Sequence, residues 1–229
     1  MVISAVCWLV LLLGWLTVRP EAHHAAAHPV GVWAALVQWL LMVGAMMLPL
    51  LGPQAGLIAR RGLRRRSRQA VAAFVTGYLA VWAVAGLALL LLMLASGVAG
   101  PGPVVACLLA AAGWHCTPLR RAAVRQCGRV PTLALTGGRA HVDCVAAGAL
   151  AGRLAVWTCG LAMSAMCFAH GPVLAVGVTG VLLAECRSGP NPEARIGSAT
   201  QACWFVVLAG LVAFAAGWPG AASLVWAVT

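Results

Sequence analysis

The sequence predicts an all-α integral membrane protein, a polytopic bundle of transmembrane helices. Of its 229 residues, 63% are hydrophobic and only 8% are charged, whereas a soluble domain carries about 25% charged residues. The apolar residues form long runs, and runs of roughly 18 or more are typical of membrane-spanning helices. A membrane β-barrel would instead alternate apolar and polar residues over about ten positions, which this chain does not do. We therefore expect one membrane domain, residues 1–229, with about six or seven spanning helices.

The apolar runs place the expected helices in order along the chain. The first run has no positive residue before it, which favours a retained helix over a cleaved signal peptide. The fourth run is short for a bilayer, so it either spans with a tilt or enters only part of the way. The expected spans are residues 2–18, 30–51, 70–96, 103–117, 142–169, 172–186 and 199–218.

The basic residues predict how these helices are oriented. Every basic side chain is an arginine, and most arginines lie between apolar runs. Arginine collects in cytoplasmic loops, where it faces anionic lipid headgroups, so we expect the lipid bilayer to be the partner of these loops. The expected cytoplasmic loops are residues 59–69, 118–141 and 187–197, which places the amino terminus in the cytoplasm.

The composition also excludes several functions. The net charge of +11 does not indicate nucleic-acid binding, because basic and aromatic residues do not interleave in a soluble module. The chain has no Walker loop, glycine-rich nucleotide motif, Ser-His-acid triad or HExxH helix. With only 4 acidic residues, paired-carboxylate catalysis is also disfavoured. We therefore expect a protein that is not an enzyme and does not bind nucleic acid.

One face of the run 142–169 suggests a metal site. Cys159, Met163, Met166 and His170 are spaced four, three and four residues apart, so they lie within roughly 60° of one helix face. Thiolate and thioether ligands select copper(I), and imidazole tolerates it. The alternative is that cysteine and methionine, both apolar, only pack against neighbouring helices.

A methionine pair on the run 30–51 could belong to the same site. Met42 and Met46 share a helix face, and Pro49 follows them. A proline at this position frees a backbone carbonyl and can kink the helix, which opens polar groups toward the bundle interior. The two thioethers could bind the same copper ion, or they could fill a kinked packing helix.

Other polar residues leave further alternatives open. Glu185 and Arg153 are the charged residues nearest the membrane interior, where charges face partners or transport paths. Glu185 could instead be solvated among headgroups, near Arg187. Metal-compatible residues around the loop 118–141 could either form a second site at the membrane face or be unrelated: His115, Cys116, Cys127, His141, Asp143 and Cys144.

Four short motifs follow one another over about two-thirds of the chain. They are Trp39-x-x-Met42-x-x-Ala45-Met46-Met47-x-Pro49, Thr117-Pro118-Leu119-Arg120 followed by Cys127, Cys159-x-x-x-Met163, and Leu182-Leu183-Ala184-Glu185. In this order and spacing they resemble an uncharacterised family of predicted metal-binding bacterial integral membrane proteins. The resemblance implies metal binding, with copper as the suspected ion, in a bacterial plasma or inner membrane. It also makes Cys127 a candidate ligand at the cytoplasmic face.

The chain departs from this family pattern at several cysteine positions. Ala123 stands where the family has a cysteine four residues before Cys127, and Ala155 and Thr158 stand where its cysteine-rich helix has others. Either this member binds metal weakly or not at all, or other cysteines compensate. The cysteines that could compensate are Cys116, Cys144 and Cys167.

The sequence thus predicts a membrane protein that binds copper(I) and delivers it to a metal-accepting protein or membrane complex. The expected ligands are Cys159, Met163, Met166, His170, Met42, Met46 and Cys127. One alternative is a subunit of a membrane transporter or channel that uses Glu185 and Arg153 along a permeation path. Another is a structural helical subunit of a larger membrane complex, whose sulfur residues only pack.

Overall fold

The computed structural model describes residues 2–17, 29–61, 67–97, 100–127, 138–168, 172–188 and 194–217. Apart from short turns, these residues are helical, which confirms the predicted all-α class. The helices are α1 (Val2–Thr17), α2 (Pro29–Met47), the 3₁₀ turn η2 (Leu48–Leu51), α3 (Gly52–Arg61), α4 (Ser67–Ser96), α5 (Pro101–His115), α6 (Pro118–Cys127), α7 (Gly138–Phe168), α8 (Pro172–Ser188) and α9 (Ala194–Gly217).

The number of helices that could cross a membrane is smaller than expected. Within the described ranges, the stretches long and apolar enough to span are Gly31–Arg60, Ser67–Ser96, Arg139–Phe168 and Ala199–Gly217. Pro101–His115 and Pro118–Gln126 add a fifth if this pair, bent by 78°, counts as one broken span. The expected count of six or seven is therefore not confirmed for this part of the chain.

Two expected spans are present, within the described residues, as shorter apolar helices. The apolar helical stretches Ile3–Gly14 and Val173–Glu185 correspond to the expected spans 2–18 and 172–186. Apolar composition fixed their positions, but a crossing also requires about 20 residues in one helix at 1.5 Å per residue.

The expected cytoplasmic loop 118–141 begins with a helix rather than an open loop. Thr117 caps α6: its hydroxyl oxygen accepts a hydrogen bond from the Arg120 amide at 3.3 Å. Pro118 occupies the first helical position, where its missing N–H costs nothing. Hydropathy alone overlooked this helix because its arginines lower the mean hydropathy of the segment.

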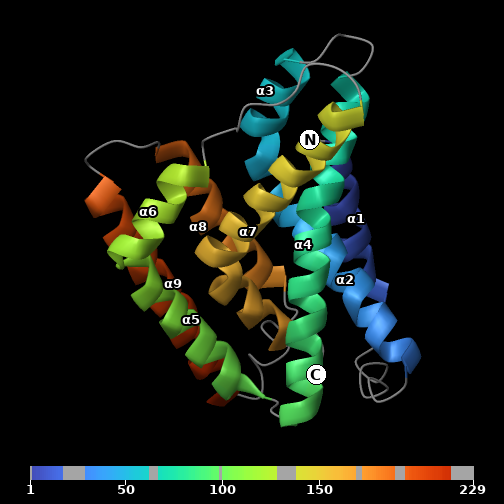
Figure 1. The fold of residues 1–229 in the computed structure, drawn as a ribbon. Coiled ribbons are helices and arrows are strands. Elements are labelled where there is room, and N and C mark those ends of the chain that lie inside the picture. Colours follow the sequence, from blue (N-terminus) through green and yellow to red (C-terminus); the bar gives the residue numbers. More distant parts are fainter. Residues whose placement is uncertain are drawn as a thin grey trace.

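Helices α4 and α7 form the closest pair in the bundle, and Figure 1 shows them side by side. A Cβ atom placed at Gly77 of α4 would overlap the Val145 carbonyl oxygen, and one at Gly148 of α7 would overlap the Phe74 carbonyl oxygen. These two glycines let the helix backbones touch, as small residues do in membrane helix pairs. Around this pair, α2 and α3 pack on α4, α5 and α6 pack on α7, α1 packs on α2, and α9 packs on α5 and α8.

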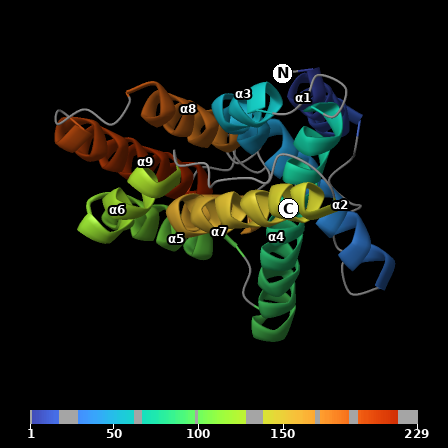
Figure 2. The ribbon, with the colours of Figure 1, turned by 45° about the horizontal axis from the view of Figure 1, so that its top comes forward.

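The helix ends that flank the three arginine-rich segments lie at one end of the molecule. In Figure 1 this is the upper end, formed by the C-terminal ends of α3 and α8, the N-terminal ends of α4, α7 and α9, and helix α6. Figure 2 tips the same end toward the viewer. The N-terminal end of α5 and the C-terminal ends of α4 and α9 lie at the opposite end. The alternation expected from the arginines therefore agrees with the direction of the helices.

Pro49 interrupts the second helix, as expected, but the carbonyl that it frees is not left open. Proline has no N–H, so the regular helical hydrogen bond to the carbonyl of Ala45 cannot form. The Ser4 hydroxyl of α1 donates to this carbonyl oxygen at 2.8 Å. The break thus anchors α1 to α2 instead of opening a polar group toward the interior.

Candidate functional site

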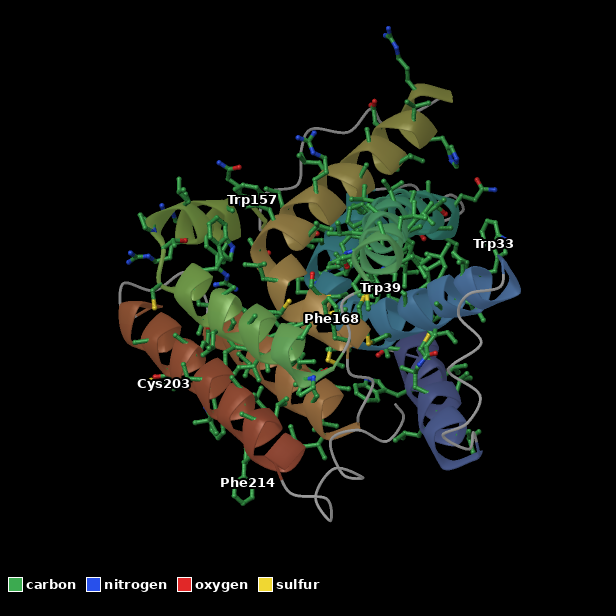
Figure 3. All side chains as sticks on the ribbon, turned by 90° about the horizontal axis from the view of Figure 1, so that it is seen from below. Trp33, Trp39, Trp157, Phe168, Cys203 and Phe214 are labelled. Carbon is green, nitrogen blue, oxygen red and sulfur yellow. The ribbon has the colours of Figure 1, made fainter. Side chains whose placement is uncertain are left out.

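The methionines predicted as copper ligands lie deep in the core. Met42 and Met46 on α2 are 2% and 1% exposed, and Met163 and Met166 on α7 are fully buried. All four belong to one continuous cluster of buried side chains. In Figure 3, seen from below, several sulfur atoms lie in the middle of the molecule, in the region of Trp39 and Phe168. This burial agrees with both the copper site and the packing alternative.

The other predicted ligands are placed less completely. Cys159 is half-buried on α7, with its Sγ 3.5 Å from the hydroxyl oxygen of Thr158. His170 lies outside the described residues, and Cys127 ends α6 with a side chain that is also outside them. Among the residues that the structure does describe, no three His, Cys, Asp or Glu side chains gather to hold a metal. A copper site with three or more ligands here would therefore need thioether ligands as well.

A buried ion pair joins two of the motifs. Arg120, from Thr-Pro-Leu-Arg, is 1% exposed although it carries a full charge. Its Nη1 and Nη2 atoms donate to Oε1 and Oε2 of Glu185, each at 2.6 Å. Bidentate pairing of this kind is the strongest form of charged hydrogen bond between side chains. The two charges cancel inside the protein, which is what makes the burial of Arg120 tolerable.

The helix with the third motif completes this arrangement. The Nε atom of Arg120 donates to the Thr158 carbonyl oxygen on α7 at 3.0 Å. Cys159 follows Thr158 on α7, and its Sγ lies 3.5 Å from the Thr158 hydroxyl oxygen. Residues of α6, α7 and α8 that are far apart in sequence thus meet around one side chain. We name Arg120, Glu185, Thr158, Cys159 and His115 the Arg120 cluster.

His115 is the remaining member of the Arg120 cluster. It ends α5, is 1% exposed, and packs its ring against Phe205 of α9 with 4.7 Å between ring centroids. Its Nδ1 lies 2.7 Å from the carbonyl oxygen of Ala111. Only Cys116 and Thr117 separate it from α6, the helix that carries Arg120. The Arg120 cluster is therefore formed at the junction of α5, α6, α7, α8 and α9.

The structure contradicts two of the sequence-based alternatives. Arg153 is exposed and Glu185 pairs with Arg120, so a permeation path along Glu185 and Arg153 has no support in the described residues, and Glu185 is not simply solvated among headgroups. The second metal site at the loop is also not formed among the side chains that the structure describes. His115 belongs to the Arg120 cluster near Thr158, while Cys144 lies 14 residues earlier on α7, about 21 Å along the helix axis.

The sequence held a signal for the Arg120 cluster that hydropathy did not reveal. Arg120 and Glu185 each stand as the one charged residue of a short motif in a chain with only 4 acidic residues. Opposite charges isolated in apolar surroundings are expected to find each other when both are buried. Their separation of 65 residues kept this pairing out of reach of local patterns.

Comparison with known proteins gives one match. No curated protein and no solved structure is significantly similar to the chain. The profile of the PpoB2 family, described as a copper chaperone, matches residues 36–213. This range is more than three-quarters of the chain, and it contains the four methionines predicted as copper ligands and the Arg120 cluster. A match to a copper chaperone family is also consistent with the metal-binding family that the motifs resemble. The chain therefore belongs to the PpoB2 copper chaperone family.

Proposed function

We propose that this protein is a membrane-embedded chaperone that holds copper(I) with buried sulfur residues and passes it to an acceptor. The observation that carries the proposal is the burial of Met42, Met46, Met163 and Met166 in a chain of the PpoB2 copper chaperone family. Thioethers are soft ligands that select copper(I) over the harder divalent ions. Because a thioether is neutral, it holds the ion without a strong charge attraction, which suits an ion that must be handed on.

The membrane setting rests on composition and on the distribution of arginines. The candidate spans of the described residues present mostly apolar side chains to their surroundings, including Leu91, Trp157 and Phe214 on the molecular surface. The arginine-rich helix ends gather at one end of the molecule, which we assign to the cytoplasmic side of a bacterial plasma or inner membrane. The amino terminus of α1 would then also be cytoplasmic.

The proposal includes a metal-accepting partner and no catalysis. A chaperone binds and releases one ion without chemical change, so it needs ligands and an acceptor but no acid, base or nucleophile. The buried charges of the described core fit this, since Arg120 and Glu185 hold each other. The transporter alternative loses its main support for the same reason, because Glu185 is not free to line a permeation path.

Copper transfer distinguishes a chaperone from a transporter. Purified protein is loaded with copper(I), reconstituted into liposomes, and offered either an external methionine-rich acceptor peptide or a copper(I) chelator sealed inside the vesicles. We expect copper to move to the external acceptor while the internal chelator stays empty. Substitution of Met163 and Met166 by leucine should reduce copper loading, whereas Met93→Leu, on α4, serves as the matched control. Copper accumulation inside the vesicles would contradict the chaperone assignment.

A further inference from the structure

One nitrogen of the His115 ring has no hydrogen-bond partner among the described residues, although the ring is 1% exposed. The Ala111 carbonyl oxygen can only accept a hydrogen bond, so the Nδ1 atom at 2.7 Å must carry the proton. The Nε2 atom of His115 is then the unprotonated nitrogen. It is a buried lone pair directed away from the backbone carbonyl that anchors the ring.

A histidine held in this way is prepared to bind a metal ion. Metal-binding histidines usually donate their other ring N–H to a backbone carbonyl or carboxylate, which fixes the tautomer and the ring orientation. Ala111 supplies this second-shell contact, and Phe205 covers one side of the ring. Buried polar atoms without a partner are rare in proteins, and an ion or water that fills the position is the usual explanation.

A soft ligand lies in the same Arg120 cluster. Cys159 follows Thr158, whose carbonyl oxygen accepts a hydrogen bond from Arg120 at 3.0 Å, and only Cys116 and Thr117 separate His115 from the helix that carries Arg120. Copper(I) is satisfied by two ligands in a linear arrangement, so one thiolate and one imidazole are sufficient. This explains how a site could exist where no three His, Cys, Asp or Glu side chains of the described residues gather.

The charges of the Arg120 cluster indicate the valence of the ion. Arg120 and Glu185 already cancel each other. A copper(I) ion that replaces the thiol proton of Cys159 leaves the site neutral, because the ion carries one positive charge, the thiolate one negative charge and the imidazole none. A divalent ion with the same ligands would leave one uncompensated positive charge in a buried site, which is strongly unfavourable. The site therefore favours a monovalent soft cation.

We propose that His115 Nε2 and Cys159 Sγ together bind copper(I) and form the release position of the chaperone. This proposal rests on the proposed function. Cys159 precedes Met163 and Met166 on α7, by about 6 Å and about 10 Å along the axis. Helix α7 starts at the arginine-rich end, so Cys159 lies closer to that end than the two methionines (Figure 1). Copper would thus move from the methionines toward the arginine-rich end.

X-ray absorption spectroscopy on the copper-loaded protein tests this assignment. The intact protein is purified in detergent under reducing conditions and loaded with one equivalent of copper(I). We expect a first coordination shell that contains both nitrogen and sulfur. In His115→Leu the nitrogen contribution should disappear, and the copper(I) affinity, measured by competition with a chromogenic chelator, should fall at least about tenfold. His141→Leu, which alters an exposed histidine on α7, is the matched control and should leave both results unchanged.

The outcomes separate this proposal from the broader one. A purely sulfur shell in the intact protein, or an unchanged affinity in His115→Leu, would overturn the His115–Cys159 site and leave the chaperone function standing. Intact protein that binds no copper would overturn both. Should His115→Leu fail to fold, His115→Gln takes its place: the nitrogen contribution should disappear in this variant too, and a nitrogen contribution that persists would overturn the His115–Cys159 site.

Discussion

Arg120 shows how a single side chain can hold several helices of a bundle together. All three of its contacts reach other helices: two hydrogen bonds go to Glu185 on α8 and one goes to the Thr158 carbonyl on α7. A charge at this burial is tolerated only while its partner is present. The energetic importance of the pair therefore lies less in its attraction than in the cost of leaving one member alone.

Removal of the carboxylate tests this asymmetry. We expect Glu185→Gln to lower the free energy of unfolding by about 3–5 kcal/mol, because Arg120 would remain buried without a counter-charge. Replacement of both residues, by Arg120→Met and Glu185→Leu, should cost much less than the single change. Denaturant titration in mixed micelles measures both values. Arg153→Gln, at an exposed position, is the control. A double variant with a lower free energy of unfolding than Glu185→Gln would contradict this account.

Thr117 links two helices through its side-chain hydroxyl, and the Thr-Pro sequence already indicates a helix start at this position. Its hydroxyl donates to the Trp114 carbonyl at 2.8 Å and accepts from the Arg120 amide at 3.3 Å, so it links the end of α5 to the start of α6. With Pro118 it turns the chain by 78° between the two helices and directs Arg120 toward α7. The Thr-Pro-Leu-Arg motif is thus a cap, a helix start and an ion-pair residue in one short segment.

At the scale of helices, the α4–α7 contact should be the least tolerant of added volume. In Gly77→Ala the new Cβ would overlap the Val145 carbonyl oxygen, and backbone atoms cannot move aside as a flexible side chain can. We expect a loss of about 1–3 kcal/mol in the free energy of unfolding. Gly113→Ala on α5, where a Cβ meets nothing within 4 Å, is the matched control. Equal unfolding curves for the two variants would show that α4 and α7 are not packed this closely.

The break at Pro49 predicts a coupling between α1 and α2. Ser4→Ala removes the donor to the Ala45 carbonyl and should cost about 0.6–1.7 kcal/mol, the range of hydrogen bonds between membrane helices. In a Pro49→Ala background the regular helical bond can return, so the same serine change should have a smaller effect. Unfolding of the four proteins in a double-mutant cycle measures the difference. Additive effects would mean that Ser4 does not satisfy the carbonyl freed by Pro49.

At the scale of the whole molecule, the arginine distribution predicts one orientation in the membrane. In a background without other cysteines, Arg60→Cys and Arg139→Cys mark the arginine-rich end, and Ser96→Cys marks the opposite end. We expect a membrane-impermeant thiol reagent to label Ser96→Cys on intact spheroplasts and the other two only after lysis. The reverse pattern would place the arginine-rich end outside the cell and contradict the assigned topology.

Composition and apolar runs were sufficient to predict the all-α class and the approximate position of most helices. The buried face that carries Met163 and Met166 also followed from helical spacing. Local patterns could not reveal α6, because its arginines give the segment a low hydropathy. Nor could they reveal the ion pair of Arg120 with Glu185, which depends on packing between segments 65 residues apart. The expected number of spans is not confirmed among the described residues, because apolar composition indicates burial or membrane contact and does not determine helix length.

Copper content of the purified protein tests the central claim most directly. The protein would be isolated in detergent under reducing conditions from copper-supplemented cells and analysed by mass spectrometry, together with a Cys159→Ser, Met163→Leu variant and a Cys203→Ser, Met93→Leu control. We expect about one copper per chain in the intact protein and in the control, since two or three soft ligands define one copper(I) site. The Cys159→Ser, Met163→Leu variant should contain almost none. Intact protein without copper, or a Cys159→Ser, Met163→Leu variant with unchanged copper, would contradict the account of a copper chaperone built on these residues.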